Sequence, residues 1–299
     1  MNIIQCNALT KRYGGTVALD ALNLELTSGE PIALIGPNGA GKTTLLSLLC
    51  GFIRPSQGNI TILGHPPGAA ALSGQLSALP QDALLDPRLS VVRQLRFFAR
   101  LQGMSKTEAS KEVSRVLATV DLESSAKTRP TDLSHGMRKR IAIAQSLIGS
   151  PSLVLLDEPT AGIDPPNARM IRELVREQSD KITFIVSSHN LDELERLCAT
   201  VVYLEKGKLI SVGPVSDDEE HDVLTLRAPT LPVEQFIALC QSLPGIIAVS
   251  RTTQGDYLIE TDSEMQASVA VLQLIADQGW RYKQLSRGRT LEERLYGNG

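Results

Sequence analysis

Two stretches of the chain carry residue types that bind phosphate groups. The first, from Gly36 to Thr43, reads GPNGAGKT and matches the pattern GxxxxGK[ST]. Glycines here let backbone N–H groups converge on phosphate oxygens, Lys42 can neutralise the β and γ phosphates of a nucleotide, and the Thr43 hydroxyl can ligate Mg²⁺. An apolar run that predicts a strand (31–36) precedes it, and a predicted helix (43–52) follows it. This is the context that a phosphate-binding loop requires.

The second stretch, SHGMRKR (134–140), begins a segment that reads as a basic helix. Ser134 can cap this helix, Gly136 leaves room for a close approach, and the positive end of the helix dipole attracts phosphate. The first loop already fills this role within one chain, so these residues alone leave the purpose of a second phosphate-binding helix start open.

Polar side chains end two other apolar runs. Asp157 and Glu158 lie near the end of SLVLLDEP (152–159), and His189 is the last residue of ITFIVSSH (182–189). Both runs predict buried strands, and α/β folds gather their ligands at the carboxyl edge of such strands. One carboxylate on Mg²⁺ and a neighbouring base would suffice for phosphoryl transfer, with the histidine at the γ-phosphate. Taken alone, the same residues also fit a solvated acidic turn and a core histidine.

The remaining pattern predicts the elements that position these groups. Strand-like segments occupy the first 30 residues, separated by turns at Gly14-Gly15 and Ser28-Gly29. The pattern is helical from about 83 to 150, where Ser105 and Glu108 form a capping box for a helix that extends to about Val120. Residues 201–213 read as a hairpin.

The composition changes at Pro214. Residues 214–222 are polar and acidic and predict a linker. Residues 223–299 alternate as βαββαβ, the ferredoxin-like order. The sequence therefore predicts two domains, 1–213 and 223–299.

Composition limits the function classes. The chain has 299 residues, of which 42% are hydrophobic, and a net charge of −3, which gives no reason to expect a nucleic-acid partner. Its four cysteines form no CxxC pair, and its start lacks the pattern of a secretory signal. Apolar runs fall short of the ~20 residues that cross a bilayer. We expect a cytoplasmic protein, with any membrane part in another polypeptide.

The motifs, in this order and spacing, resemble the nucleotide-binding subunit of ATP-binding-cassette (ABC) transporters over roughly residues 1–213. In that family, the signature LSGGQ of one subunit closes over ATP held by the P-loop of its partner. The resemblance identifies LSHGM (133–137) as the signature, Asp157 as the metal carboxylate, Glu158 as the catalytic base and His189 as the switch histidine.

Three further residues take roles from the same resemblance. Tyr13 resembles the adenine-stacking aromatic, and Gln81 resembles the residue that links Mg²⁺ and the attacking water to the permease contact. Asp164, in AGIDP, resembles the residue that crosses to the other subunit. The residues thus expected to bind the nucleotide are Tyr13, Gly36, Pro37, Asn38, Gly39, Ala40, Gly41, Lys42, Thr43, Thr44, Ser134, Gly136 and Asp164. Those expected at the metal are Thr43, Gln81 and Asp157, and those expected in catalysis are Glu158, His189 and Gln81.

The resemblance also implies a fold and a function. The fold is α/β: a P-loop ABC cassette with a mixed sheet core, an antiparallel β subdomain and a helical subdomain (about 83–150), followed by a small α+β ferredoxin-like domain. The function is an ATPase, with ATP and Mg²⁺, that pairs with a second ABC subunit and drives a separate membrane permease from the cytoplasmic face of the cell membrane. SHGMRKR resembles the signature of type-2 exporter subunits, which implies export.

The sequence leaves three alternative functions open. They are a soluble ABC protein that acts on a macromolecular partner, an importer ATPase with a ligand-sensing C-terminal domain, and a binding module that does not hydrolyse ATP. His135 and Met137 depart from the glycine and glutamine usual in the signature, which bears on the catalytic rate. The segment 290–297 resembles the end of the short C-terminal domain of many type-2 exporter ATPases.

Overall fold

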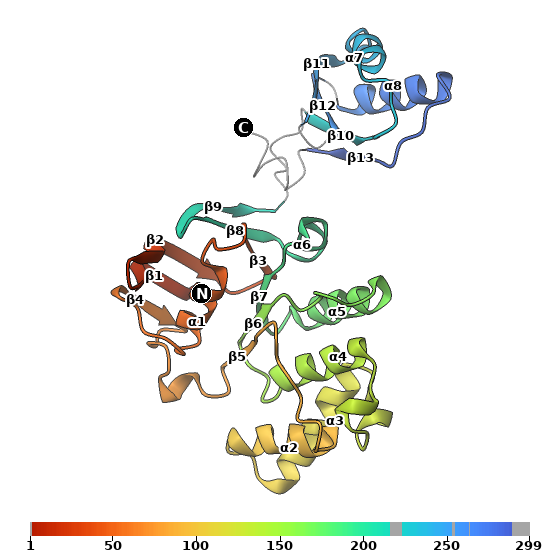
Figure 1. Ribbon diagram of the computed structural model, residues 1–299. Helices are drawn as coiled ribbons and strands as arrows, with labels where there is room; N and C mark the ends of the chain where they lie inside the picture. The colour runs from red at the N-terminus through yellow and green to blue at the C-terminus, as the bar shows by residue number, and fades with distance from the viewer. Residues whose placement is uncertain (1, 216–222, 253–254, 263, 289–299) are drawn as a thin grey trace. The chain divides into compact units, whose positions relative to one another are not determined.

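The computed structural model describes residues 2–215, 223–252, 255–262 and 264–288 (Figure 1). The chain divides into two compact units, Met1–Gly213 and Pro214–Gly299. Most of the expected linker, residues 216–222, and the segment 290–297 lie outside the described residues. Pro214, which we expected in the linker, is the last residue of strand β9.

A three-stranded antiparallel sheet opens the first unit, in the order β2-β1-β4. In β2, residues 22, 24 and 26 are buried leucines and the residues between them are exposed, so one face packs on the core. Tyr13 pairs with Thr16 where β1 turns into β2. The strands are β1 (Asn2–Tyr13), β2 (Thr16–Thr27) and β4 (Gln57–Ile62).

A six-stranded sheet forms the centre of this unit, in the order β5-β6-β7-β3-β8-β9. The pairs from β5 to β8 are all parallel, and every residue of β3, β6 and β7 is buried. Such two-sided burial explains why these strands read as continuous apolar runs. The strands are β3 (Ile32–Ile35), β5 (Leu76–Leu79), β6 (Leu153–Asp157), β7 (Thr183–Ser187), β8 (Thr200–Glu205) and β9 (Lys208–Pro214).

Helices complete the unit in two groups. Helices α2, α3 and α4 contact one another and form the predicted helical subdomain, separate from the three-stranded sheet in Figure 1. The capping box of Ser105 and Glu108 is present at the start of α3. Within the described ranges, no helix has the length and apolar character needed to span a membrane. The helices are α1 (Lys42–Leu49), α2 (Val91–Leu101), α3 (Lys106–Thr119), α4 (His135–Ser146), α5 (Pro165–Gln178) and α6 (Leu191–Leu197).

The second unit confirms the predicted βαββαβ order. Its antiparallel sheet has the order β11-β12-β10-β13, so the first strand lies in the middle, as in ferredoxin-like folds. Its core includes Phe236, Tyr257 and Trp280, whose rings pack edge to face. The elements are β10 (Val223–Arg227), α7 (Val233–Gln241), β11 (Ile246–Arg251), β12 (Tyr257–Thr261), α8 (Glu264–Asp277) and β13 (Gln284–Arg287).

Replacing Phe236 with alanine should destabilise the second unit selectively. Phe236 is fully buried, and its ring centroid lies 4.6 Å from that of Tyr257. Loss of a buried phenylalanine costs about 3–5 kcal/mol of the free energy of unfolding. In the full chain, amide hydrogen exchange should accelerate across 223–288 and stay unchanged in 2–213.

The matched control is Met265→Ala, because the Met265 side chain is 74% exposed in the same unit. It should leave exchange unchanged in both units. Unchanged exchange in 223–288 would contradict the role of Phe236 in the core of the second unit, and faster exchange in 2–213 would contradict the predicted selectivity.

Candidate functional site

The P-loop connects the buried strand β3 to helix α1. Gly36 has φ +148°, and a Cβ at this position would lie 2.1 Å from the carbonyl oxygen of Leu204, so only glycine fits. Lys42, the first residue of α1, donates from Nζ to the carbonyl oxygen of Gly36 at 2.6 Å. The lysine and the positive end of the α1 dipole therefore face the same loop, an arrangement that binds anions.

The P-loop also lies close to the hairpin that carries Tyr13. Gly41 packs against Ala18 and Leu19 of β2, which follow the β1–β2 turn by a few residues. Tyr13 is 49% exposed, and Nζ of Lys11 lies 5.0 Å from its ring centroid. An exposed aromatic ring on a hairpin that contacts a phosphate-binding loop can stack on a nucleobase.

The ends of three parallel strands meet at Ser187. In the register, Ser187 is aligned with Leu34 of β3 on one side and with Asp157 of β6 on the other. Its hydroxyl donates to Oδ1 of Asp157 at 2.5 Å, and Asp157 is 9% exposed. The second carboxylate oxygen, Oδ2, lies 3.5 Å from Oγ1 of Thr43. Hard oxygen donors of this kind suit Mg²⁺, which is usually held by one or two carboxylates together with phosphate oxygens.

Glu158 and His189 form a second pair of interacting side chains at this edge of the sheet, in addition to Asp157 and Thr43. Oε2 of Glu158 lies 2.8 Å from Nδ1 of His189, and the glutamate side chain is 12% exposed. The backbone of Glu158 has φ +50°, which is uncommon for a residue other than glycine, and its N–H donates to both the hydroxyl and the carbonyl oxygen of Ser187. Residues held in this backbone region cluster at active sites.

Gln81 approaches the same edge from β5. Leu79 is aligned with Leu156, which places Gln81 at about the level of Glu158 along the strands. The Gln81 side chain is exposed, and its backbone carbonyl accepts from Nζ of Lys139 in α4 at 2.9 Å. Burial lowers the pKa of Lys139, and three carboxylates, Asp82, Glu158 and Asp157, partly oppose that shift. Lys139 therefore joins the signature helix α4 to the segment that follows β5.

The signature residues gather with Asp164 at the starts of two helices. Ser134 caps α4 as predicted, accepting from the backbone N–H of Met137 at 3.2 Å. A Cβ on Gly136 would lie 2.4 Å from Cγ of Asn167 in α5, so glycine permits this contact. Asn167 in turn donates from Nδ2 to both carboxylate oxygens of Asp164, at 2.9 and 3.0 Å.

Hydrogen bonds from Asn167 also hold the pKa of Asp164 below its usual value, so this residue is an anion at neutral pH. Ser134, His135 and Asp164 are all exposed. They form a polar surface at the starts of α4 and α5. In Figure 1, α4 belongs to the helical group, whereas α1, which follows the P-loop, lies beside the three-stranded sheet.

The structure thus separates the predicted residues into two groups. The P-loop, Thr43, Asp157, Glu158 and His189 meet at the strand ends, while Ser134, Gly136 and Asp164 meet at the helix starts. Sequence reasoning missed Ser187, Lys139 and Asn167. Ser187, a polar residue at the end of the largely apolar strand β7, carried a detectable signal. Nothing in the sequence pattern indicated the contacts that Lys139 and Asn167 make.

The chain is similar in sequence to known ATP-binding proteins. Residues 19–161 match the ABC transporter family. The chain is 37% identical over 214 residues to the Nod factor export ATP-binding protein I of Cupriavidus metallidurans, covering 71% of each protein. It is 34% identical over 218 residues to the linearmycin resistance ATP-binding protein LnrL of Bacillus subtilis, covering 72% of this chain and 70% of that one.

A solved structure shares the fold of the first unit. CbiO1 of Clostridium perfringens, described as part of the ABC transporter complex cbiONQ, superposes with a TM-score of 0.64 at 31% identity, covering 71% of this chain and 88% of that one. The predicted cassette fold is confirmed. The phosphate-binding loop, the paired carboxyl residues at a buried strand end and these similarities together show that the chain belongs to the family of ABC transporter ATP-binding subunits, which bind and hydrolyse ATP.

Proposed function

We propose that two copies of the cassette, or this one and a close relative, enclose ATP between them and drive a membrane permease in the direction of export. The observation that carries the proposal is the division of the site residues into two groups. One chain presents a P-loop with its carboxylates, and it also presents an exposed, capped helix start that suits phosphate. A head-to-tail pair would bring the helix start of each copy to the P-loop of the other.

Nucleotide binding uses residues from both copies. In one copy, residues 36–44 surround the phosphates with backbone N–H groups and the Lys42 ammonium, and Tyr13 stacks on the adenine. In the other copy, Ser134 and the backbone beside Gly136 contact the γ-phosphate through the start of α4. Asp164 lies on the same exposed surface, where it contacts the facing copy.

The residues present fit Mg²⁺ bound together with ATP. The Thr43 hydroxyl and the Asp157 carboxylate already lie within 3.5 Å of each other, and Gln81 follows β5 at about the level of Glu158. When bound, Mg²⁺ would neutralise charge that builds up on the phosphate oxygens. Ser187 holds Asp157 in place by donating to its other oxygen.

Hydrolysis needs a base and a group that orients it. Glu158 accepts a proton from the attacking water, while Gln81 helps to position that water. Because an ionised carboxylate can only accept hydrogen bonds, Nδ1 of His189 donates to Glu158, and an imidazole that is protonated on both nitrogens would also donate from Nε2 to the γ-phosphate. The His189 side chain is 74% exposed in the single copy. Such exposure is expected of a residue that would contact ATP at this edge.

Exposed apolar residues between the strand edge and α2 suit contact with a permease. Leu84, Phe97 and Leu101 are 93%, 57% and 66% exposed. They follow Gln81 in the chain, and Phe97 and Leu101 share one face of α2. The names of the relatives concern Nod factor export and linearmycin resistance, and CbiO1 is part of a transporter complex, which supports a permease partner and export. The chain would then act at the cytoplasmic face of the membrane, where ATP is supplied.

Replacing Glu158 with glutamine should trap an ATP-bound dimer. The amide keeps the size of the side chain but cannot take the proton, so turnover should fall about a hundredfold or more. ATP that is not hydrolysed continues to contact both copies and stabilises their association. Gel filtration of the purified full chain with ATP and Mg²⁺ should show a dimer.

Lys42→Ala is the control for this experiment, because it removes the charge that binds the phosphates. It should bind ATP weakly and elute as a monomer under the same conditions. If Glu158→Gln stays monomeric while saturated with ATP, the shared site is wrong.

A charge in the apolar surface of α2 should release the chain from the membrane. Phe97→Glu would place a carboxylate where we expect an apolar contact, and burying an unpaired charge opposes binding. In cells that express the complete transporter, most of this variant should appear in the supernatant after the membranes are pelleted. Ile210→Glu on β9, at a similar exposure of 54%, should stay with the membranes. Equal membrane retention of the two variants would rule out α2 as the contact.

A further inference from the structure

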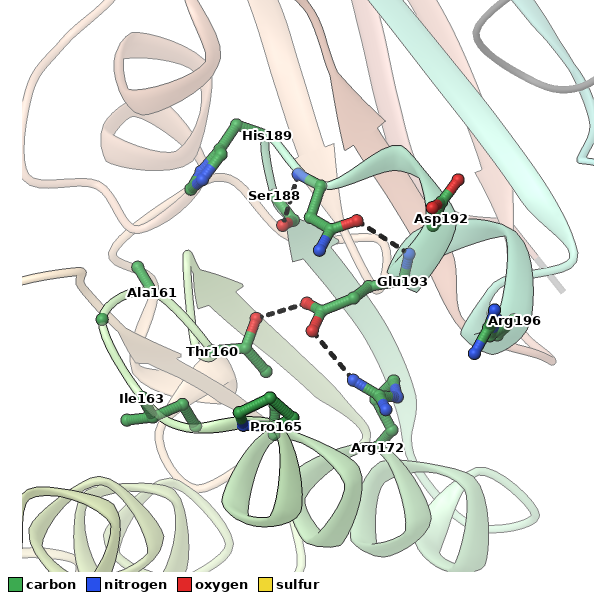
Figure 2. A pocket seen from close by; sticks show the side chains of 13 residues that line it. Thr160, Ala161, Ile163, Pro165, Arg172, Ser188, His189, Asp192, Glu193 and Arg196 are labelled. Carbon is green, nitrogen blue, oxygen red and sulfur yellow. Dashed lines mark hydrogen bonds and ion pairs between the residues drawn. The ribbon is translucent and has the colours of Figure 1, made fainter. Parts of the chain in front are cut away.

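The carboxylate of Glu193 connects three segments near the strand ends. Its Oε2 accepts from the Thr160 hydroxyl at 2.6 Å, and its Oε1 accepts from Nη1 of Arg172 at 2.8 Å. Thr160 lies in the loop after β6, Arg172 lies in α5, and Glu193 lies in the first turn of α6 (Figure 2). Both oxygens of one side chain are therefore used between elements that are far apart in the sequence.

Thr160 lies on the loop that carries two of the proposed site residues. It follows Glu158 by two positions and precedes Asp164 by four. Glu193 lies four positions after His189 and is joined to the same turn, because its backbone N–H donates to Oδ1 of Asn190 at 3.2 Å. The Thr160–Glu193 contact thus ties the loop of Glu158 and Asp164 to the helix that begins next to His189.

Close packing does not hold this loop on the side facing α6. A pocket of about 380 Å³ lies between them, lined in part by Ala161, Ile163 and Ser188 (Figure 2). Residues beside a cavity lose packing contacts on that side, so directional polar contacts decide their position. The Arg172–Glu193 pair is suited to this role, because each side chain is only 19% exposed and little screened by water.

We propose that Glu193 is a positioning residue for ATP hydrolysis, acting through Thr160 and itself held by Arg172. The inference rests on the proposed function, since it assigns Glu158 and Asp164 the roles given above. Glu193 fixes the distance between the loop that supplies the base and the turn that supplies His189. It also sets where Asp164 stands on the surface that meets the second copy.

The test compares Thr160→Val with Thr160→Ser in the full chain. Valine keeps the shape and removes the hydroxyl, whereas serine restores it. With valine, kcat should fall about tenfold to a hundredfold, because small displacements of reacting groups have effects of this size. The KM for ATP should change less than about threefold, because the P-loop is untouched. Serine should recover most of the wild-type kcat, and Glu193→Gln, which removes the ion pair, should lower kcat as well.

A second readout needs no turnover. In the nucleotide-free chain, amide hydrogen exchange of 160–164 should accelerate in Thr160→Val and return toward wild type in Thr160→Ser. Arg169→Ala is the matched control on α5, because it breaks an ion pair with Glu173 in which the two side chains are 75% and 47% exposed. It should alter neither the exchange of 160–164 nor kcat.

The two readouts separate the possible failures. If the wild-type chain hydrolyses ATP and Thr160→Val has the same kcat, the positioning role is overturned. A fall in ATP binding that matches the fall in kcat, or faster exchange throughout residues 2–213, would overturn it in favour of a general structural role. A wild-type chain that does not hydrolyse ATP, while exchange of 160–164 still responds to the hydroxyl, would instead count against the proposed function.

Discussion

The hydroxyl of Ser187 is the contact on which the strand-end site depends. It donates to the Asp157 carboxylate and accepts from the backbone N–H of Glu158. One buried hydroxyl therefore fixes the positions of both carboxyl residues. The contact is possible because β7 lies between β6 and β3 in parallel register, with Ser187 aligned to Asp157 and Leu34. Parallel strands end at one edge of the sheet, and there the P-loop that follows β3 meets the acidic pair. A shift of register by one residue would point Asp157 away from Thr43.

Two loops at this edge connect the strand-end residues to the exposed surface that carries Asp164. The loop after β6 begins with Glu158 and ends with Asp164, which caps α5 and is held by Asn167 against the signature helix. The turn after β7 carries His189 and leads into α6. Both have a polar contact with Glu193, so Glu158, His189 and the exposed surface that carries Asp164 belong to one connected network. In such a network, association of two cassettes and the geometry of hydrolysis would depend on each other.

Much of this protein follows from local rules. The phosphate-binding loop was predictable because its glycines are needed for a backbone path that admits no side chain, as Gly36 shows. The strands β3, β6 and β7 were predictable because burial on both faces requires continuous apolar residues. The start of α3 followed from its capping box, and the start of α4 from Ser134. The alternation in the second unit predicted its fold because each helix and strand must bury one apolar face.

The sequence by itself therefore indicated the phosphate-binding loop, the buried strands β3, β6 and β7, the starts of α3 and α4, and a second ferredoxin-like unit after the cassette. Only the tertiary structure decided which of these residues meet. The pairing of Glu158 with His189, the alignment of Ser187, the approach of Lys139 to Gln81 and the bridge made by Glu193 all join positions that are distant along the chain. Short-range periodicity reports how one segment buries its own apolar face, whereas such contacts depend on sheet order and register, which arise only when the segments pack together.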